Sequence, residues 1–263
     1  MILRREGRRV LALGQTSHAW VSGQLARSWG NQQFPRPQPA EAIALGAEQH
    51  DIGWARFDLK PEFDPETSLP RSFLKTSVQR HLAIWADAPE TLLAASSYAA
   101  LVASMHGRAL SELRRRNADC TEARLLDLHI TAERERQSLL SGRLDLSEAQ
   151  TRVIQEQMWA WDGISLALCH GWADFETSAP AAAKSVPLRM RSEEGNAFIV
   201  DPWPFTIATV EVHCEARPLA PSYRDEQELQ DAFQAAIPER LTFTLRRAAT
   251  ALGGDVIDGD PRS

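Results

Sequence analysis

The sequence predicts an α+β protein: a mostly α-helical bundle with an N-terminal β-hairpin and a small C-terminal antiparallel sheet. Three observations support this fold class. Apolar residues alternate on either side of Glu6-Gly7, which is typical of a hairpin. From about Ser17 to residue 172 they recur with a helical period. Beyond residue 188 the chain is rich in β-branched and aromatic residues, which favour strands.

Six helices are expected, separated by prolines and capping residues. Pro39 precedes the second helix, and Pro89 is expected to start the fourth. Ser147 and Gln150 can form a capping box at the start of the last long helix. The expected helices are 17–29, 39–57, 72–86, 90–110, 121–141 and 147–172.

The amino-acid composition of the C-terminal third differs from that of the helical region. Residues 177–187 have the composition of a linker, because alanine, serine and proline dominate them. Strands are expected at 197–200, 205–214 and 241–245, with one amphipathic helix at about 225–237. The predicted division is a hairpin at 1–14, a helical metal-binding domain at 15–175, an α+β cap at 188–252 packed on that domain, and a disordered tail at 253–263.

The bulk composition is that of an ordinary globular protein. Of 263 residues, 43% are hydrophobic and 24% are charged, and the formal net charge is −6. This charge disfavours nonspecific binding to nucleic acid or to an anionic membrane. The run Arg114-Arg115-Arg116 is interpreted as a solvated loop. The three cysteines indicate no disulfide framework, and no signal peptide is apparent, so a cytoplasmic location is expected.

The most informative feature is an ordered series of metal-ligand residue types on or beside apolar helix faces. His18, for example, shares a face with Val21 and Leu25. An unpaired polar or charged group is costly to bury, and several such groups can satisfy one another by binding one metal. The series consists of His18, His50, Asp51, His81, His106 and Asp162.

A single histidine on an apolar face is usually a core residue with an ordinary hydrogen-bond partner. Four of them, together with a histidine-aspartate pair and a later aspartate in an apolar segment, are harder to explain one by one. His129 is a contrast, since its expected helix is strongly charged outside one narrow apolar stripe. It is interpreted as structural or exposed. The series therefore favours one or two divalent metal ions, with iron, manganese, zinc and nickel all compatible with imidazole and carboxylate ligands.

The order H…HD…H…H…D resembles the His-Asp (HD) superfamily of metal-dependent phosphohydrolases over roughly residues 15–172. The chain also resembles an uncharacterised bacterial family in segments such as SHAWVSGQLARSWGN, HDIGWARFD, SFLKTSVQRHLAIW and DPWPF. That second likeness spans nearly the whole chain and carries no established activity. Both likenesses imply an HD-like helical domain.

The HD resemblance implies a role for each matching residue. His18, His50, Asp51 and Asp162 would bind a first metal, and Asp51 would bridge to a second metal held by His81 and His106. A hydroxide activated by the metals would then attack a phosphate ester, a small-molecule substrate. Asp51 and Lys75 are the candidate catalytic residues, and Lys75 and Arg80 are candidates for holding the substrate phosphate. Nucleic acid and membrane partners are not expected.

Two other functions share this pattern. Di-iron oxygenases of the HD fold have the same ligand order and activate O₂ at the metals. A noncatalytic protein could keep the metal or the pocket for ligand binding or for structure. The expected function is metal-dependent hydrolysis of a phosphomonoester or phosphodiester, with these two as alternatives. The substrate, the metal and the oligomeric state are left open by the sequence.

Overall fold

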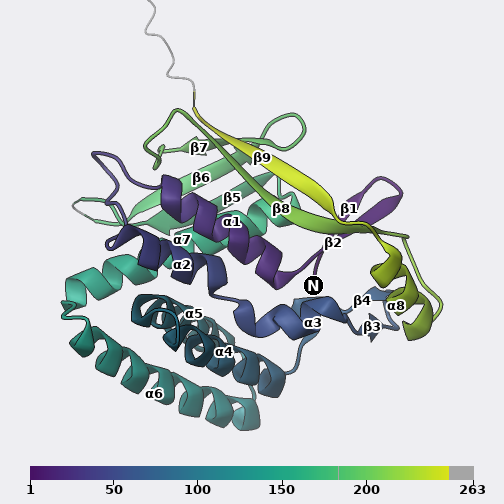
Figure 1. The fold of residues 1–263 in the computed structure, drawn as a ribbon, viewed down its shortest axis with the longest axis horizontal. Helices are drawn as coiled ribbons and strands as arrows, with labels where there is room; N and C mark the ends of the chain where they lie inside the picture. The colour runs from purple at the N-terminus through teal and green to yellow at the C-terminus, as the bar shows by residue number, and fades with distance from the viewer. Residues whose placement is uncertain (183, 249–263) are drawn as a thin grey trace, which may run out of the picture.

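A curled seven-stranded sheet forms one side of the molecule in the computed structural model, which describes residues 1–182 and 184–248 (Figure 1). The strand order is β1-β2-β8-β9-β7-β6-β5. The strands are β1 (Ile2–Glu6), β2 (Arg9–Leu13), β5 (Asp174–Ala179), β6 (Val186–Ser192), β7 (Ala197–Asp201), β8 (Thr209–Leu219) and β9 (Glu239–Arg247).

The expectation of a mostly helical HD-like bundle with a small antiparallel sheet is wrong. The sheet is large, and it is mixed, because β7 pairs with β9 in parallel, with Ala197 opposite Thr244. The N-terminal hairpin is part of it, since Val10 of β2 pairs with Leu219 of β8. The expected linker at 177–187 instead contains the end of β5 and the start of β6. The alanines and prolines of this segment gave no local sequence signal for the pairing of β5 with β6.

Helices cover one side of this sheet in successive layers (Figure 1). Helices α1 and α7 pack on the sheet, α2 and α5 pack against them, and α4 and α6 flank α5. The helices are α1 (Gln15–Ser28), α2 (Ala40–Gln49), α3 (Ala55–Leu59), α4 (Val78–Leu93), α5 (Ser97–Arg115), α6 (Cys120–Arg143), α7 (Glu148–His170) and α8 (Glu226–Ala235), with 3₁₀ turns at Ile52–Trp54 and Phe73–Lys75. The short strands β3 (Phe63–Asp64) and β4 (Leu69–Pro70) form a separate pair.

Several helix boundaries differ from the sequence prediction. The expected helix at 39–57 ends at Gln49, and the chain turns at His50 and Asp51 before a 3₁₀ turn begins. Pro89 does not start a helix but lies inside α4. The next helix begins after Ser96, whose hydroxyl accepts a hydrogen bond from the Ala99 N–H at 3.2 Å. The capping box of Ser147 and Gln150 is confirmed at the start of α7.

One apolar core joins the sheet to the helices. Leu11, Val212 and Phe243 of the sheet belong to the same buried cluster as Leu25 of α1 and Trp161 of α7. Helices α1 and α7 are therefore fixed against the sheet, and their other sides meet α2 and α5. The predicted division into a body and a cap stays a prediction, and the expected tail at 253–263 lies outside the described residues. None of the helices in the described ranges is both long and apolar enough to cross a membrane.

Candidate metal centre

His18 is held at the junction of α1 and α7. Its side chain is almost fully buried, and its Nδ1 lies 2.9 Å from the hydroxyl oxygen of Ser165 on α7. The Ser165 hydroxyl donates its hydrogen to the carbonyl oxygen of Asp162 at 2.8 Å. Because that hydrogen is already used, the Ser165 oxygen accepts from His18, and Nδ1 of His18 carries a proton. Nε2 of His18 then faces the carboxylate of Asp51, with 3.0 Å between the nitrogen and Oδ2.

His50 is oriented by the end of its own helix. Its Nδ1 lies 2.8 Å from the carbonyl oxygen of Ala47, which can only accept a hydrogen bond. Nδ1 therefore carries a proton, and Nε2 is the nitrogen that can act as a ligand once its own proton is displaced. A backbone partner of this kind fixes the tautomer and the ring orientation of metal-binding histidines. Nε2 of His50 lies 3.3 Å from Oδ1 of Asp162 and 3.6 Å from Oδ2 of Asp51.

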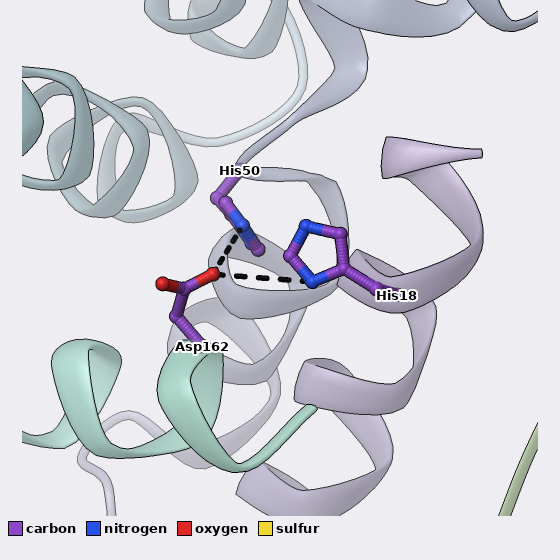
Figure 2. Close-up of side chains that lie close together, drawn as sticks. All are labelled: His18, His50 and Asp162. Carbon is purple, nitrogen blue, oxygen red and sulfur yellow. Dashed lines mark ion pairs between the residues drawn. The ribbon is translucent and has the colours of Figure 1, made fainter. Parts of the chain in front are cut away.

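Asp162 completes the first group of potential ligands. Figure 2 shows its Oδ1 directed between the rings of His18 and His50. The Oδ1 atom is 3.9 Å from Nδ1 of His18. Ligand atoms of these three residues all lie within 4.8 Å of one another.

A second, overlapping group consists of His50, Asp51 and His106. The His106 ring comes from α5, and its centroid is 4.3 Å from that of His50. Nε2 of His106 is 3.9 Å from Oδ1 of Asp51. Because the two groups share His50, they form one compact centre with five potential ligands in the described part of the chain rather than two separate sites.

The unsatisfied polar atoms of this centre are consistent with a cation-binding site. Within the described part of the chain, Nε2 of His50, Oδ1 of Asp51 and Nδ1 of His106 are buried without a hydrogen-bond partner. Such atoms are rare in folded proteins, and each needs an explanation. Two ligands that bind one ion at ~2.1 Å, at right angles, are about 3 Å apart. The nitrogen-oxygen distances around His50 and His18 are close to that spacing, so the donor set fits a transition-metal ion.

The electrostatics of the centre favour positive charge. Burial opposes the charged form of His50, but the neighbouring Asp51 and Asp162 carboxylates outweigh it and raise the pKa of His50 to about 9. Burial would also raise the pKa of Asp51, yet the charge of His50 and the hydrogen bond from His18 lower it. Burial and repulsion from His50 lower the pKa of His106 to about 4. The centre thus holds two ionised carboxylates, and a divalent cation would compete with the His50 proton.

His81 lies apart from both groups of ligands. Its ring is stacked on Trp85, with 4.8 Å between the ring centroids. Arg114 donates from its guanidinium to Nδ1 of His81 and to the carbonyl oxygen of Thr76, the latter at 3.2 Å. Burial and the charge of Arg114 lower the pKa of His81 to about 4. Since Nδ1 of His81 accepts from Arg114, its role as a ligand to a second metal stays a prediction.

Lys75 and Arg80 are engaged in ion pairs at the surface. The Lys75 ammonium is 2.8 Å from Oδ2 of Asp64 and 2.7 Å from Oε2 of Glu66. Arg80 pairs with Glu62, and its guanidinium lies over the Phe57 ring. Neither residue lines the pocket that leads to the metal centre.

That pocket has a volume of about 320 Å³ and is lined by His18, Asp51, His106 and Asp162 of the centre, and by His81 and Arg114. Arg114 is the cation that sequence reasoning missed. It lies eight residues after His106 and four after Leu110, on the same face of α5. The helix was expected to end at 110, which assigned Arg114 to a loop. Ser165, three residues after Asp162, could have been found from the same periodicity.

A family model described as "Protein of unknown function (DUF3891)" matches residues 1–220. The chain belongs to this family. The match extends beyond the helices and includes β1, β2 and the strands from β5 to β8. No curated protein and no solved structure is significantly similar to the chain. DUF3891 membership carries no activity, so the chemistry must be inferred from the pocket.

Proposed function

We propose that this DUF3891 protein is a metal-dependent hydrolase of phosphate esters. The observation that carries the proposal is that one pocket is lined both by potential metal ligands and by Arg114, which has no carboxylate partner among the described residues. Among the described residues, the Arg114 side chain donates hydrogen bonds to the carbonyl oxygen of Thr76 and to the imidazole of His81. A guanidinium next to a metal centre is suited to bind a phosphate oxygen. The HD resemblance supports the same class of reaction.

The residues that would hold a divalent ion are His18, His50, Asp51, His106 and Asp162. Arg114 occupies Nδ1 of His81, which supports one metal with a guanidinium beside it rather than two metals. When bound, the ion would supply a Lewis acid for a phosphoryl oxygen and would lower the pKa of water.

The chain's own groups account for positioning and charge. Arg114 would hold the phosphate of the substrate and stabilise the charge that develops on its oxygens. Oδ1 of Asp51 has no hydrogen-bond partner in the described structure and would accept a hydrogen bond from the attacking water. Because the pKa of Asp51 is lowered, this carboxylate would orient the water rather than remove its proton. Trp54 and Trp85 are buried side chains that line the same pocket and reduce its contact with solvent.

The test begins with protein stripped by a chelator and reconstituted with manganese, iron or zinc. Hydrolysis of 4-nitrophenyl phosphate and bis(4-nitrophenyl) phosphate is then measured with and without oxygen. We expect turnover that requires metal, continues without oxygen and is lost in His50→Gln. His213→Gln serves as the matched control, because His213 lies on β8 and is not among the pocket residues. Turnover that requires both iron and oxygen would instead support an oxygenase.

A further inference from the structure

Apolar side chains form most of the wall of the pocket outside the metal centre. Trp54, Trp85, Phe73, Leu110 and Leu166 line it. They come from five different segments, which are the 3₁₀ turn at Ile52–Trp54, α4, the 3₁₀ turn at Phe73–Lys75, α5 and α7. A site for a strongly hydrated ligand would offer hydrogen-bond donors and acceptors on these surfaces instead.

The rim of the pocket is apolar as well. Leu74 is 72% exposed and Leu113 is 45% exposed, and both line the pocket. Leu74 lies in a 3₁₀ turn and Leu113 near the end of α5, so two separate segments each present a leucine at the same opening. Exposed apolar side chains that gather around a concave site commonly mark a ligand surface.

The charges in the pocket are few and nearly balanced. A divalent metal would neutralise the Asp51 and Asp162 carboxylates, and imidazoles that bind the metal would add no charge. Nδ1 of His81 accepts a hydrogen bond from Arg114, so this ring adds no charge either. The Arg114 guanidinium would then be the one uncompensated charge among the lining residues. One positive charge pairs well with one negative charge. A ligand with three or four negative charges would bring the rest into an apolar enclosure, where they would lack partners.

On the basis of the proposed function, we infer that the substrate is a phosphodiester monoanion with a large hydrocarbon or aromatic substituent. The phosphate lies between the metal centre and Arg114. The substituent packs on Trp54 and Trp85 and extends past Leu74 and Leu113 to the opening. The volume of about 320 Å³ is at the lower end of the range for small-molecule sites, which suits one such group. A polyphosphate, such as a nucleoside triphosphate, does not fit this distribution of charge.

The experiment measures binding separately from turnover. Manganese-reconstituted protein is titrated by calorimetry with diphenyl phosphate, with dimethyl phosphate and with ATP, and the contents are analysed afterwards for hydrolysis products. Diphenyl and dimethyl phosphate carry the same single charge and differ in apolar surface. We expect diphenyl phosphate to bind about tenfold or more tightly than the other two, because only its rings bury substantial apolar area.

Variants then test which residues bind the phosphate of the ligand and which bind its apolar substituent. Arg114→Gln should weaken diphenyl phosphate about ten- to hundredfold and leave the metal content unchanged, since it removes one charge-assisted contact. Arg114→Lys should recover part of that loss. Arg115→Gln is the matched control, because Arg115 pairs with Asp127 at 2.9 Å and does not line the pocket. Leu113→Gln should weaken diphenyl phosphate but not dimethyl phosphate.

The outcomes separate this inference from the proposed function. Selective binding of diphenyl phosphate without products of any phosphate ester would contradict hydrolysis and support the ligand class. Equal or tighter binding of dimethyl phosphate or ATP would overturn the ligand class, even if the protein hydrolyses phosphate esters. Unchanged diphenyl phosphate affinity in folded, metal-loaded Arg114→Gln would overturn the role of Arg114.

Discussion

Nδ1 of His18 donates a hydrogen bond of 2.9 Å to the hydroxyl oxygen of Ser165, which joins α1 to α7 at the metal centre. Ser165 also accepts a hydrogen bond from Ser22, again at 2.9 Å, and donates to the carbonyl oxygen of Asp162. One hydroxyl group thus fixes the ring of one potential ligand and the backbone of another. Partners of this kind tune a metal site almost as strongly as the ligands themselves.

We therefore expect Ser165→Ala to lower the affinity for a transition metal about 10- to 100-fold. The change leaves His18 in place but removes the acceptor that holds its tautomer. Metal affinity is measured by competition with a chromogenic chelator. Ser104→Ala is the matched control, because Ser104 is equally buried and accepts a hydrogen bond from Gln137 away from the centre. Equal metal affinity in the two variants would contradict the positioning role of Ser165.

A second prediction concerns the turn after Asp51. A Cβ atom at Gly53 would come within 2.4 Å of the carbonyl oxygen of Ile84, which is backbone of α4. Gly53→Ala should therefore destabilise the fold by about 1–3 kcal/mol and weaken metal binding, because the turn at Asp51 must move. Denaturant unfolding and metal titration check both effects.

The control for Gly53 is Gly142→Ala in α6. A Cβ at Gly142 meets nothing within 4 Å, and alanine is favoured over glycine in a helix by about 0.5–1 kcal/mol. We expect that variant to be at least as stable as the natural protein. If Gly53→Ala unfolds at the same denaturant concentration as the natural protein, the turn is more adaptable than the structure indicates.

The sequence predicted the helical half of the molecule better than the sheet. Local patterns were sufficient for α1 and α7, because apolar spacing and capping residues act within a few turns. The parallel pairing of β7 with β9 joins residues such as Phe198 and Leu245, far apart in the chain. No local pattern encodes that contact. The alanine-rich stretch around Ala181 also gave no local signal for β5 and β6 on either side of it. Tertiary packing stabilises these two strands.

The candidate site shows a similar division. Buried polar residues on apolar faces pointed to five side chains that the structure brings together, from His18 to Asp162. Their convergence could be expected because each needs a polar partner. The helix break at His50 and the position of His81 beside Arg114 depend on how helices end and meet, which the period alone does not reveal. Metal binding by these residues stays a prediction.

A third prediction separates Lys75 from Arg114. Because Lys75 is exposed and paired with Asp64 and Glu66, Lys75→Met should change turnover less than about twofold and leave the unfolding midpoint nearly unchanged. Arg114→Gln should reduce kcat/KM for a phosphate ester about tenfold or more. Steady-state kinetics of the two variants on the same substrate provide the comparison. A large loss in Lys75→Met would restore Lys75 as a catalytic residue.

The last prediction concerns stability in acid. Burial and the charge of Arg136 lower the pKa of His129 from 6.5 to about 4. Between these values the unfolded chain binds a proton that the folded protein does not, so stability falls as the pH falls from about 6.5 to about 4. His129→Asn keeps a partner for Ser111 but does not titrate, so its unfolding midpoint should depend less on pH in this window. At pH 8 neither side chain binds a proton, which makes that pH the reference for each protein. An identical pH dependence of the two unfolding midpoints would show that His129 titrates normally in the folded protein.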